Sequence, residues 1–126
     1  MKLTHLTPIL NVSDVPASLD WFEALGWERG FAWDEEGGMH SSEPTFASIQ
    51  SGRAEIFLCL GNQGARPLWM SWFLSSREEL DVIYARAVGL GCEIAMEPTD
   101  ESWGMREFHL RHPDGHIFRV SAETSS

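Results

Sequence analysis

Apolar residues recur at helical spacing in two stretches of the chain. The apolar positions of the first stretch are Val15, Leu19, Phe22 and Leu25. Those of the second stretch are Leu80, Ile83, Ala87 and Leu90. Asp14 precedes the first stretch and Ser75 and Ser76 the second, and such side chains accept hydrogen bonds from the first N–H groups of a helix. Because Gly26 and Gly91 then follow, as is common after a helix, the pattern predicts two helices.

Short apolar runs typical of strands surround each predicted helix. In the first half they are Thr4–Val12, Trp27–Trp33, Thr45–Gln50 and Ala54–Leu60. In the second half they are Leu68–Leu74, Cys92–Met96, Met105–Arg111 and His116–Ala122. Each half therefore has the order β-α-β-β-β, and a repeat of this length predicts two similar modules. We expect an α+β fold in one domain, 1–126, whose modules (about 3–61 and about 66–122) form a curved mixed sheet around a cleft.

Two irregular segments interrupt these runs, Asp34–Pro44 and Glu97–Gly104. Both are rich in Gly, Glu, Asp and Ser. Loops of this length in a compact domain are often functional, so both are candidate functional segments.

Composition and charge exclude several classes of partner. The chain has 126 residues, 43% hydrophobic and 22% charged, which is typical of a folded globular domain. Nine Lys and Arg residues against nineteen Asp and Glu give a formal net charge of −10. Such a surface repels a phosphate backbone and attracts cations, so we expect no nucleic-acid partner. Unbroken apolar runs are only a few residues long, far below the roughly 20 that cross a bilayer, so we expect no membrane segment.

Cysteine use favours a cytoplasmic protein. Cys59 and Cys92 form no CxxC pair and are too few for a disulfide scaffold. No charged segment followed by an apolar core opens the sequence, so we expect no signal peptide.

Aromatic residues add a hint about the ligand. Six Trp and seven Phe accompany a single Tyr. Because the indole N–H needs a partner when it is buried, Trp is common where ligands or partners stack.

The β-α-β-β-β repeat, the opening run Pro8–Val15 and the hairpin His112–His116 together resemble the glyoxalase/bleomycin resistance/dioxygenase (vicinal oxygen chelate) superfamily. Within it, the run Trp103–Gly115 is most similar to the bleomycin resistance proteins, which share its Trp-Gly-x-Arg-Glu-Phe stretch. The resemblance covers nearly the whole chain and implies a symmetric homodimer.

Enzymes of this superfamily hold a divalent metal with His and Glu or Gln side chains from four strands. The resemblance places these ligand positions on Thr7, on Phe57, among Trp69–Ser71, and on Arg119. Arginine stays protonated and phenylalanine has no donor atom, so we expect neither a metal nor another cofactor. A displaced metal site formed by His5, Glu55 and His109 is the alternative.

The resemblance also implies a set of ligand-binding residues. Phe31 aligns with a phenylalanine that stacks on the planar part of the drug, and Trp33 is its same-face neighbour. Trp103 and Met105 match the segment that lines the drug cleft. Phe57, Trp69 and Arg119 replace metal ligands and would line the same groove. The alternative is that some aromatics belong to the core, and the expected core aromatics are Phe22, Phe108, Phe118, Trp21 and Trp72.

Three functions are compatible with these residues. The first, which we favour, is metal-independent sequestration of a cationic, partly planar antibiotic or similar small molecule, which would confer antibiotic resistance. The second is a metalloenzyme of the same superfamily: a lyase, dioxygenase or thiol transferase. The third is an enzyme that holds an anionic substrate with Arg119 or Arg106. No Ser-His-Asp order, P-loop or GxGxxG motif indicates other chemistry.

Overall fold

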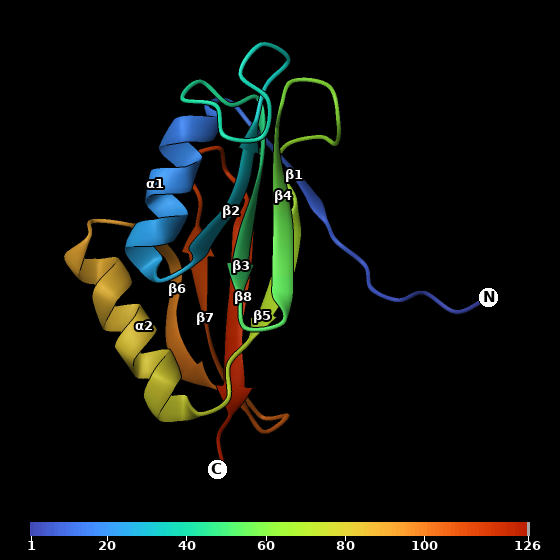
Figure 1. Ribbon diagram of the computed structural model, residues 1–126. Helices are drawn as coiled ribbons and strands as arrows, with labels where there is room; N and C mark the ends of the chain where they lie inside the picture. Colours follow the sequence, from blue (N-terminus) through green and yellow to red (C-terminus); the bar gives the residue numbers. More distant parts are fainter. Residues whose placement is uncertain (126) are drawn as a thin grey trace. The chain divides into compact units, whose positions relative to one another are not determined.

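Two units with the same order of elements make up the chain, Met1–Ala65 and Arg66–Ser126 (Figure 1). The computed structural model describes residues 1–125. The elements of unit 1 are β1 (Ile9–Val12), α1 (Val15–Leu25), β2 (Glu28–Trp33), β3 (Phe46–Ser51) and β4 (Ala54–Leu60). The elements of unit 2 are β5 (Trp69–Phe73), α2 (Arg77–Gly89), β6 (Glu93–Asp100), β7 (Met105–Arg111) and β8 (Ile117–Glu123).

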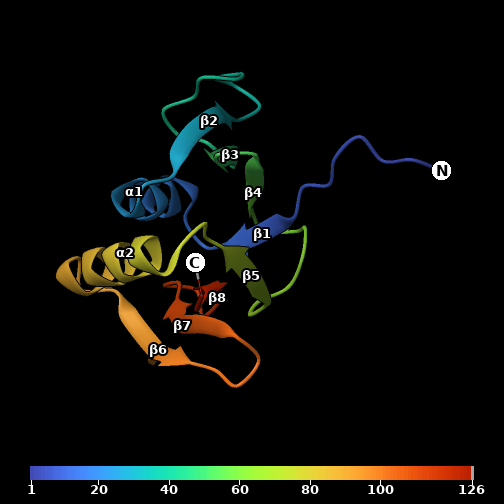
Figure 2. The ribbon, with the colours of Figure 1, turned by 90° about the horizontal axis from the view of Figure 1, so that it is seen from below.

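Each unit assembles its four strands into one mixed sheet. The strand order is β1-β4-β3-β2 in unit 1 and β5-β8-β7-β6 in unit 2. In both units the first strand lies at the edge and pairs in parallel with the last strand, while the other pairs are antiparallel. Figure 2 shows each helix lying along one side of the sheet of its own unit. The predicted α+β fold of two tandem β-α-β-β-β modules is confirmed.

Capping residues account for both ends of α1. The Asp14 side chain accepts a hydrogen bond of 2.9 Å from the Ala17 N–H. Pro16 lies in the first turn, where a missing N–H costs nothing. At the other end Gly26 has a φ of 116° and its N–H donates to the Glu23 carbonyl, which closes the last turn. The helix predicted between Asp14 and Gly26 is therefore confirmed.

One of the two candidate serines caps α2. The Ser76 hydroxyl accepts a hydrogen bond from the Glu79 N–H at 3.1 Å, whereas Ser75 donates to the Glu79 carboxylate at 2.6 Å. Leu80 is fully buried, but Leu90, which the sequence places on the same apolar stripe, is exposed at the helix end. Within residues 1–125 neither helix has the length and apolar character needed to cross a membrane.

The first strand is shorter than the predicted run Thr4–Val12. It begins at Ile9, because Pro8 has no N–H to donate and contributes only its carbonyl, which accepts from the Phe57 N–H at 3.0 Å. The preceding residues 1–8 are largely exposed and extend away from the sheet of unit 1 (Figure 1).

The strand β6 is longer than the predicted run Cys92–Met96. It continues to Asp100 and takes up part of the segment predicted to be irregular. Its pairing with β7 contains two register shifts. Pro98 is tolerated because β6 is an edge strand, where a residue without an N–H can point away from the ladder.

Each unit has a core between its helix and its sheet. Phe22 in unit 1, and Phe108 and Phe118 in unit 2, are completely buried, as predicted. Trp21 and Trp72, also predicted as core, are only partly buried. Trp21 meets the Phe22 ring edge-on at 5.0 Å, and Trp72 stacks on Phe118 at 4.4 Å, so both lie at the margins of the cores.

Candidate functional site

The sheet of unit 1 has one face that α1 does not cover, which we call face 1. Ala47, Ile49 and Leu58 are completely buried on the α1 side. Since side chains alternate along a strand, their neighbours in β3 and β4 point to the other side. Face 1 consists of Thr7, Ile9, Asn11, Glu28, Phe31, Trp33, Phe46, Ser48, Gln50, Glu55, Phe57 and Cys59.

Three phenylalanines cluster on face 1. Phe31 stacks on Phe46 with ring centroids 5.8 Å apart, and Phe57 lies 5.6 Å from Phe31 and 5.3 Å from Phe46. All three rings are partly exposed, and Trp33 is exposed beside Phe46 on the neighbouring strand. Phe31 and Phe57 were predicted as ligand-binding residues and lie in contact range of each other. Phe46 was missed because only the β2–β3 and β3–β4 registers show that it joins them.

A β-bulge in β2 brings Phe31 to face 1. Arg29 is opposite Ile49 and Ala32 is opposite Ala47, so β2 has one extra residue between them. Without this residue Phe31 would lie on the α1 side with Arg29. Gly30 is needed in the bulge because a Cβ there would be 1.9 Å from the Ser48 hydroxyl oxygen.

The sheet of unit 2 also has a face that its helix does not cover, which we call face 2. Phe108, Phe118 and Val120 are completely buried on the α2 side. The alternate residues form face 2, as the sequence predicts for Arg119 and its neighbours. Face 2 includes Trp69, Ser71, Phe73, Met105, Glu107, His109, Arg111, Ile117, Arg119, Ser121 and Glu123.

A charged pair lies at the centre of face 2. The Arg119 Nε donates to Glu107 Oε2 at 2.9 Å, and the Ser121 hydroxyl donates to the same oxygen at 3.4 Å. The Glu107 side chain is 5% exposed and the Arg119 side chain 41% exposed. Arg119 therefore neutralises a buried carboxylate while much of its guanidinium stays accessible. The Arg119 Cζ also lies 6.0 Å from the centre of the Trp103 ring, a cation–π distance.

His109 lies between this pair and an exposed tryptophan. The Trp69 ring, 62% exposed, meets the His109 ring edge-on at 5.2 Å. His109 Nε2 is buried, has no hydrogen-bond partner among residues 1–125, and lies 3.7 Å from Glu107 Oε1. Sequence reasoning missed Glu107. The only available signal was a carboxylate two positions from His109 in a strand, which placed both on one face.

The remaining predicted residues are divided between the two faces. Trp33 belongs to face 1, and Met105, partly buried, belongs to face 2. Trp103 is 58% exposed and precedes β7. Arg106 points instead to the α2 side, where it donates to Asp81 at 2.9 Å and to Asp100 at 3.0 Å. These bonds raise its pKa, and they leave Arg119 as the arginine available to an anionic substrate.

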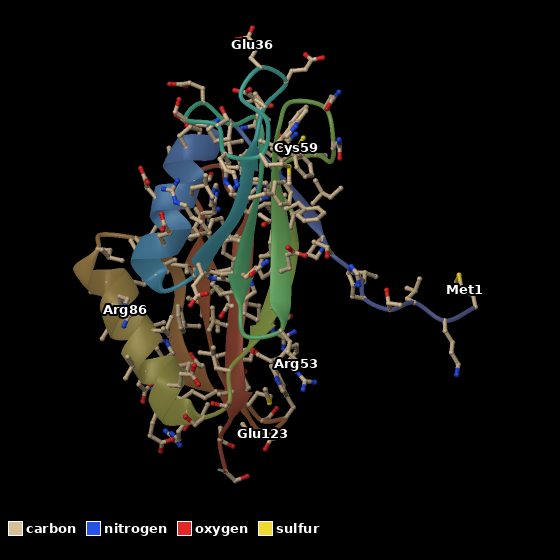
Figure 3. All side chains as sticks on the ribbon, in the orientation of Figure 1. Met1, Glu36, Arg53, Cys59, Arg86 and Glu123 are labelled. Carbon is tan, nitrogen blue, oxygen red and sulfur yellow. The ribbon has the colours of Figure 1, made fainter. Side chains whose placement is uncertain are left out.

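The irregular segment 34–44 is organised by Asp34. Its carboxylate accepts from the Ser41 hydroxyl at 2.6 Å and from the Gly37 N–H. The bond from Ser41, followed by that from Gly37, lowers the pKa of Asp34. Glu36 lies at the tip of this segment (Figure 3), so this acidic charge is held in solvent.

Two buried histidines connect the β7–β8 turn with the start of β5. His116 Nδ1 accepts from the Leu68 N–H at 3.1 Å, and His112 Nδ1 accepts from the Asp114 N–H at 3.0 Å. Both side chains are at most 1% exposed. Burial lowers the pKa of His112 to about 4, against an opposing effect of the Asp114 charge. These residues have a structural role within unit 2.

The residues at three of the four expected metal-ligand positions do not fit a metal ion. Thr7 donates to Glu55 Oε1 at 3.4 Å, and Phe57 belongs to the phenylalanine cluster. Arg119 has no lone pair to offer and is paired with Glu107. Within the described residues 1–125, no three His, Cys, Asp or Glu side chains are grouped as metal ligands would be.

The residues of the alternative, displaced metal site have other partners. His5 is exposed, and its Nδ1 lies 3.1 Å from the Thr4 hydroxyl. Glu55 accepts from Gln50 at 3.3 Å as well as from Thr7. His109 belongs to unit 2, whereas His5 and Glu55 belong to unit 1.

Several solved structures share this fold. TioX from Micromonospora sp. ML1 has a TM-score of 0.79 at 17% identity, covering 95% of this chain and 98% of that chain. A glyoxalase/bleomycin resistance protein/dioxygenase superfamily member from Sphaerobacter thermophilus has a TM-score of 0.74 at 22% identity, covering 98% of each chain. A lactoylglutathione lyase from Agrobacterium tumefaciens has a TM-score of 0.72 at 13% identity, covering 94% of this chain and 92% of that chain. At these identities the similarity establishes the fold alone.

Sequence comparison extends this result to the family. A search of curated proteins found no significant match. The family profile described as the Glyoxalase/Bleomycin resistance protein/Dioxygenase superfamily matches residues 2–120, nearly the whole chain. The chain therefore belongs to the glyoxalase/bleomycin resistance protein/dioxygenase superfamily.

Proposed function

We propose that this protein is a metal-independent small-molecule binding protein of the bleomycin resistance type. It sequesters a cationic, partly planar antibiotic or a similar ligand, acts in the cytoplasm, and works as a symmetric homodimer. The observation that carries the proposal is the composition of face 2 and its margin. There Trp69 and Trp103, both more than half exposed, accompany an Arg119–Glu107 pair at a position where enzymes of the superfamily carry a metal ligand.

Exposed tryptophans favour ligand binding over a purely structural role. An indole ring exposed to water lacks the favourable free energy of apolar burial that a core position would give it. A planar ligand stacked on such a ring recovers part of this free energy, and a cation over the ring gains roughly 0.5–2 kcal/mol more. The net charge of −10 also favours cationic over anionic ligands.

The side chains at the ligand positions favour binding without metal chemistry. Phe57 contributes an aromatic ring and Arg119 a guanidinium, and neither group has a lone pair for a divalent cation. Both groups can contact an organic ligand, through its π-face or through its acceptor oxygens. The same positions thus suit an organic ligand better than a metal.

Titration with metal-free bleomycin, followed by tryptophan fluorescence, tests the proposal. Trp103→Ala should weaken binding by roughly 1–3 kcal/mol, as expected for an aromatic anchor in a binding site. Val88→Ala, which shortens an exposed apolar side chain on α2, is the control and should bind like the wild type. Wild-type affinity in a folded Trp103→Ala variant would remove Trp103 from the site.

A further inference from the structure

We propose that Glu55 and the phenylalanine cluster of face 1 form a subsite for an organic cation, such as a quaternary or protonated ring nitrogen of the ligand. This inference rests on the proposed function and deepens it, because it names residues of unit 1 that would recognise an organic cation.

The Glu55 carboxylate has no cationic partner. It accepts only two hydrogen bonds from neutral groups, from the Thr7 hydroxyl at 3.4 Å and from the Gln50 amide at 3.3 Å. Both are long for bonds to a carboxylate. Among the described residues, no Lys, Arg or His side chain forms an ion pair with Glu55, including Arg53, which lies at the β3–β4 turn (Figure 3).

This situation is distinct among the acidic residues of the strands. Glu93, Asp100 and Glu107 each pair with an arginine. The remaining strand carboxylates without an ion pair in residues 1–125, apart from Glu55, are exposed to water: Glu28, Glu97 and Glu123. Glu55 alone in this set is partly buried, so water and salt screen its charge less than those of the exposed carboxylates.

Aromatic rings adjoin Glu55 on the same face. Phe57 follows it by two positions in β4, and side chains two positions apart in a strand share a face. Phe31 and Phe46 pack against Phe57 with centroids 5.6 Å and 5.3 Å away. A carboxylate beside partly exposed π-faces attracts weakly hydrated organic cations through charge and cation–π contacts together. A hard metal ion needs several oxygen ligands instead, and Glu55 supplies only one carboxylate.

The net negative charge of unit 1 also favours the binding of a cation. Residues 1–65 contain three basic residues, Lys2, Arg29 and Arg53, against nine acidic ones, a net charge of −6. Arg29 is already engaged by Asp20 and Glu23 on α1. The field of this unit therefore raises the local concentration of cations.

A titration with a matched pair of probes tests the subsite. N-methylquinolinium is a planar cation, and 4-methylquinoline is its neutral counterpart of the same shape at about pH 7.5. Backbone amide NMR shifts of Phe57 and Cys59 report occupancy of face 1 up to millimolar dissociation constants. The wild type should bind the cation at least about threefold more tightly than the neutral probe, as expected for one partly screened charge contact with cation–π support.

Single substitutions identify the source of that preference. Glu55→Gln should remove the preference for the cation. It should weaken binding of the cationic probe about 3- to 10-fold and leave the affinity for the neutral probe unchanged. Glu36→Gln, which removes the same charge at the tip of segment 34–44, should retain it. Phe57→Leu should weaken the binding of both probes, and it serves as the second variant if Glu55→Gln does not fold.

The outcomes separate this inference from the proposed function. Equal binding of the cation by wild type and Glu55→Gln, with shifts confined to residues of face 2, would overturn the subsite and leave the proposed function standing. A neutral probe that binds as tightly as the cation at face 1 would also overturn the subsite. Absence of binding of both probes anywhere in the protein would contradict both proposals.

Discussion

The Glu107 carboxylate changes the role that can be assigned to Arg119. The resemblance places Arg119 at a metal-ligand position, and an arginine by itself suggests an anion site. Its Nε donates to a carboxylate that is only 5% exposed, so the arginine also neutralises a charge within the sheet of unit 2. The structural role of this side chain, as distinct from its proposed role in ligand binding, can be measured with a double-mutant cycle.

Removal of Arg119 should destabilise unit 2 because Glu107 would remain buried without its cation. We expect Arg119→Met to lower the free energy of unfolding by about 1–3 kcal/mol, at the lower end for buried pairs because Arg119 is partly solvated. The double variant Arg119→Met/Glu107→Leu should regain most of the loss, since it leaves no unpaired charge. Urea unfolding measures the free energy of unfolding of both variants. An Arg119→Met variant as stable as the wild type would show that the pair does not stabilise the fold.

His112 should make stability depend on pH. Its folded-state pKa of about 4 is below the ordinary value near 6.5, so the unfolded chain binds the proton more readily between these values. The stability contributed by neutral His112 is complete above about pH 6.5 and is lost as pH falls toward 4. Protonation would also remove the Nδ1 acceptor of the Asp114 N–H.

The expected size of this effect is about 2 kcal/mol of unfolding free energy between about pH 7.5 and pH 5. Because surface carboxylates also titrate toward acid pH, the measurement compares the wild type with His112→Gln, whose amide oxygen can still accept the Asp114 N–H. The wild type should lose more stability than the variant over this range. Identical slopes would mean that His112 titrates normally in the folded protein.

At the scale of elements, helices were predictable and strand details were not. The residues that specify α1 and α2 are local: a cap, a 3.6-residue apolar period and a terminal glycine. The register shifts of β6 depend on a pairing partner that the local sequence does not specify. The position of Phe31 depends on a bulge of this kind, so its face could be assigned from sequence only by resemblance. The same holds for Phe46 and Glu107, whose partners come from other strands.

The β2 bulge should be sensitive to a single methyl group. A Cβ at position 30 would lie 1.9 Å from the Ser48 hydroxyl oxygen, so Gly30→Ala should lower the free energy of unfolding by about 1–3 kcal/mol and displace Phe31. Gly89→Ala is the matched control, because nothing lies within 4 Å of a Cβ there and alanine favours a helix. The two substitutions should change the midpoint of thermal unfolding in opposite directions, or Gly30→Ala should lower it clearly more than Gly89→Ala does. A neutral Gly30→Ala would contradict the close contact.

At the scale of the whole molecule, the two units repeat one topology but differ in chemistry. Face 1 combines a phenylalanine cluster with an unpaired carboxylate, and face 2 combines exposed tryptophans with a neutralised pair. The pattern of apolar runs predicted the repeat, and the resemblance implied the aromatic character of the faces. It did not show that the polar groups of each face have different partners, because those contacts depend on sheet register.

Exposed apolar side chains in both units favour association of two chains. Large residues such as Leu6, Phe73 and Val82 are more than half exposed. A two-fold interface would cover part of this surface and produce two equivalent sites. Sedimentation at micromolar concentration should therefore give a species of twice the 14.2 kDa chain mass. A single 14.2 kDa species would contradict the proposed dimer.

Calorimetry with and without metal removal shows whether ligand binding needs a metal ion. Metal-free bleomycin is titrated calorimetrically into protein that has been treated with EDTA and then dialysed, and into untreated protein. We predict the same affinity and stoichiometry for both samples, because Phe57 and Arg119, which the resemblance places at metal-ligand positions, have no lone pair to offer a metal ion. Binding that disappears after EDTA treatment and returns when the protein is reloaded with Zn²⁺ or Mn²⁺ would contradict it.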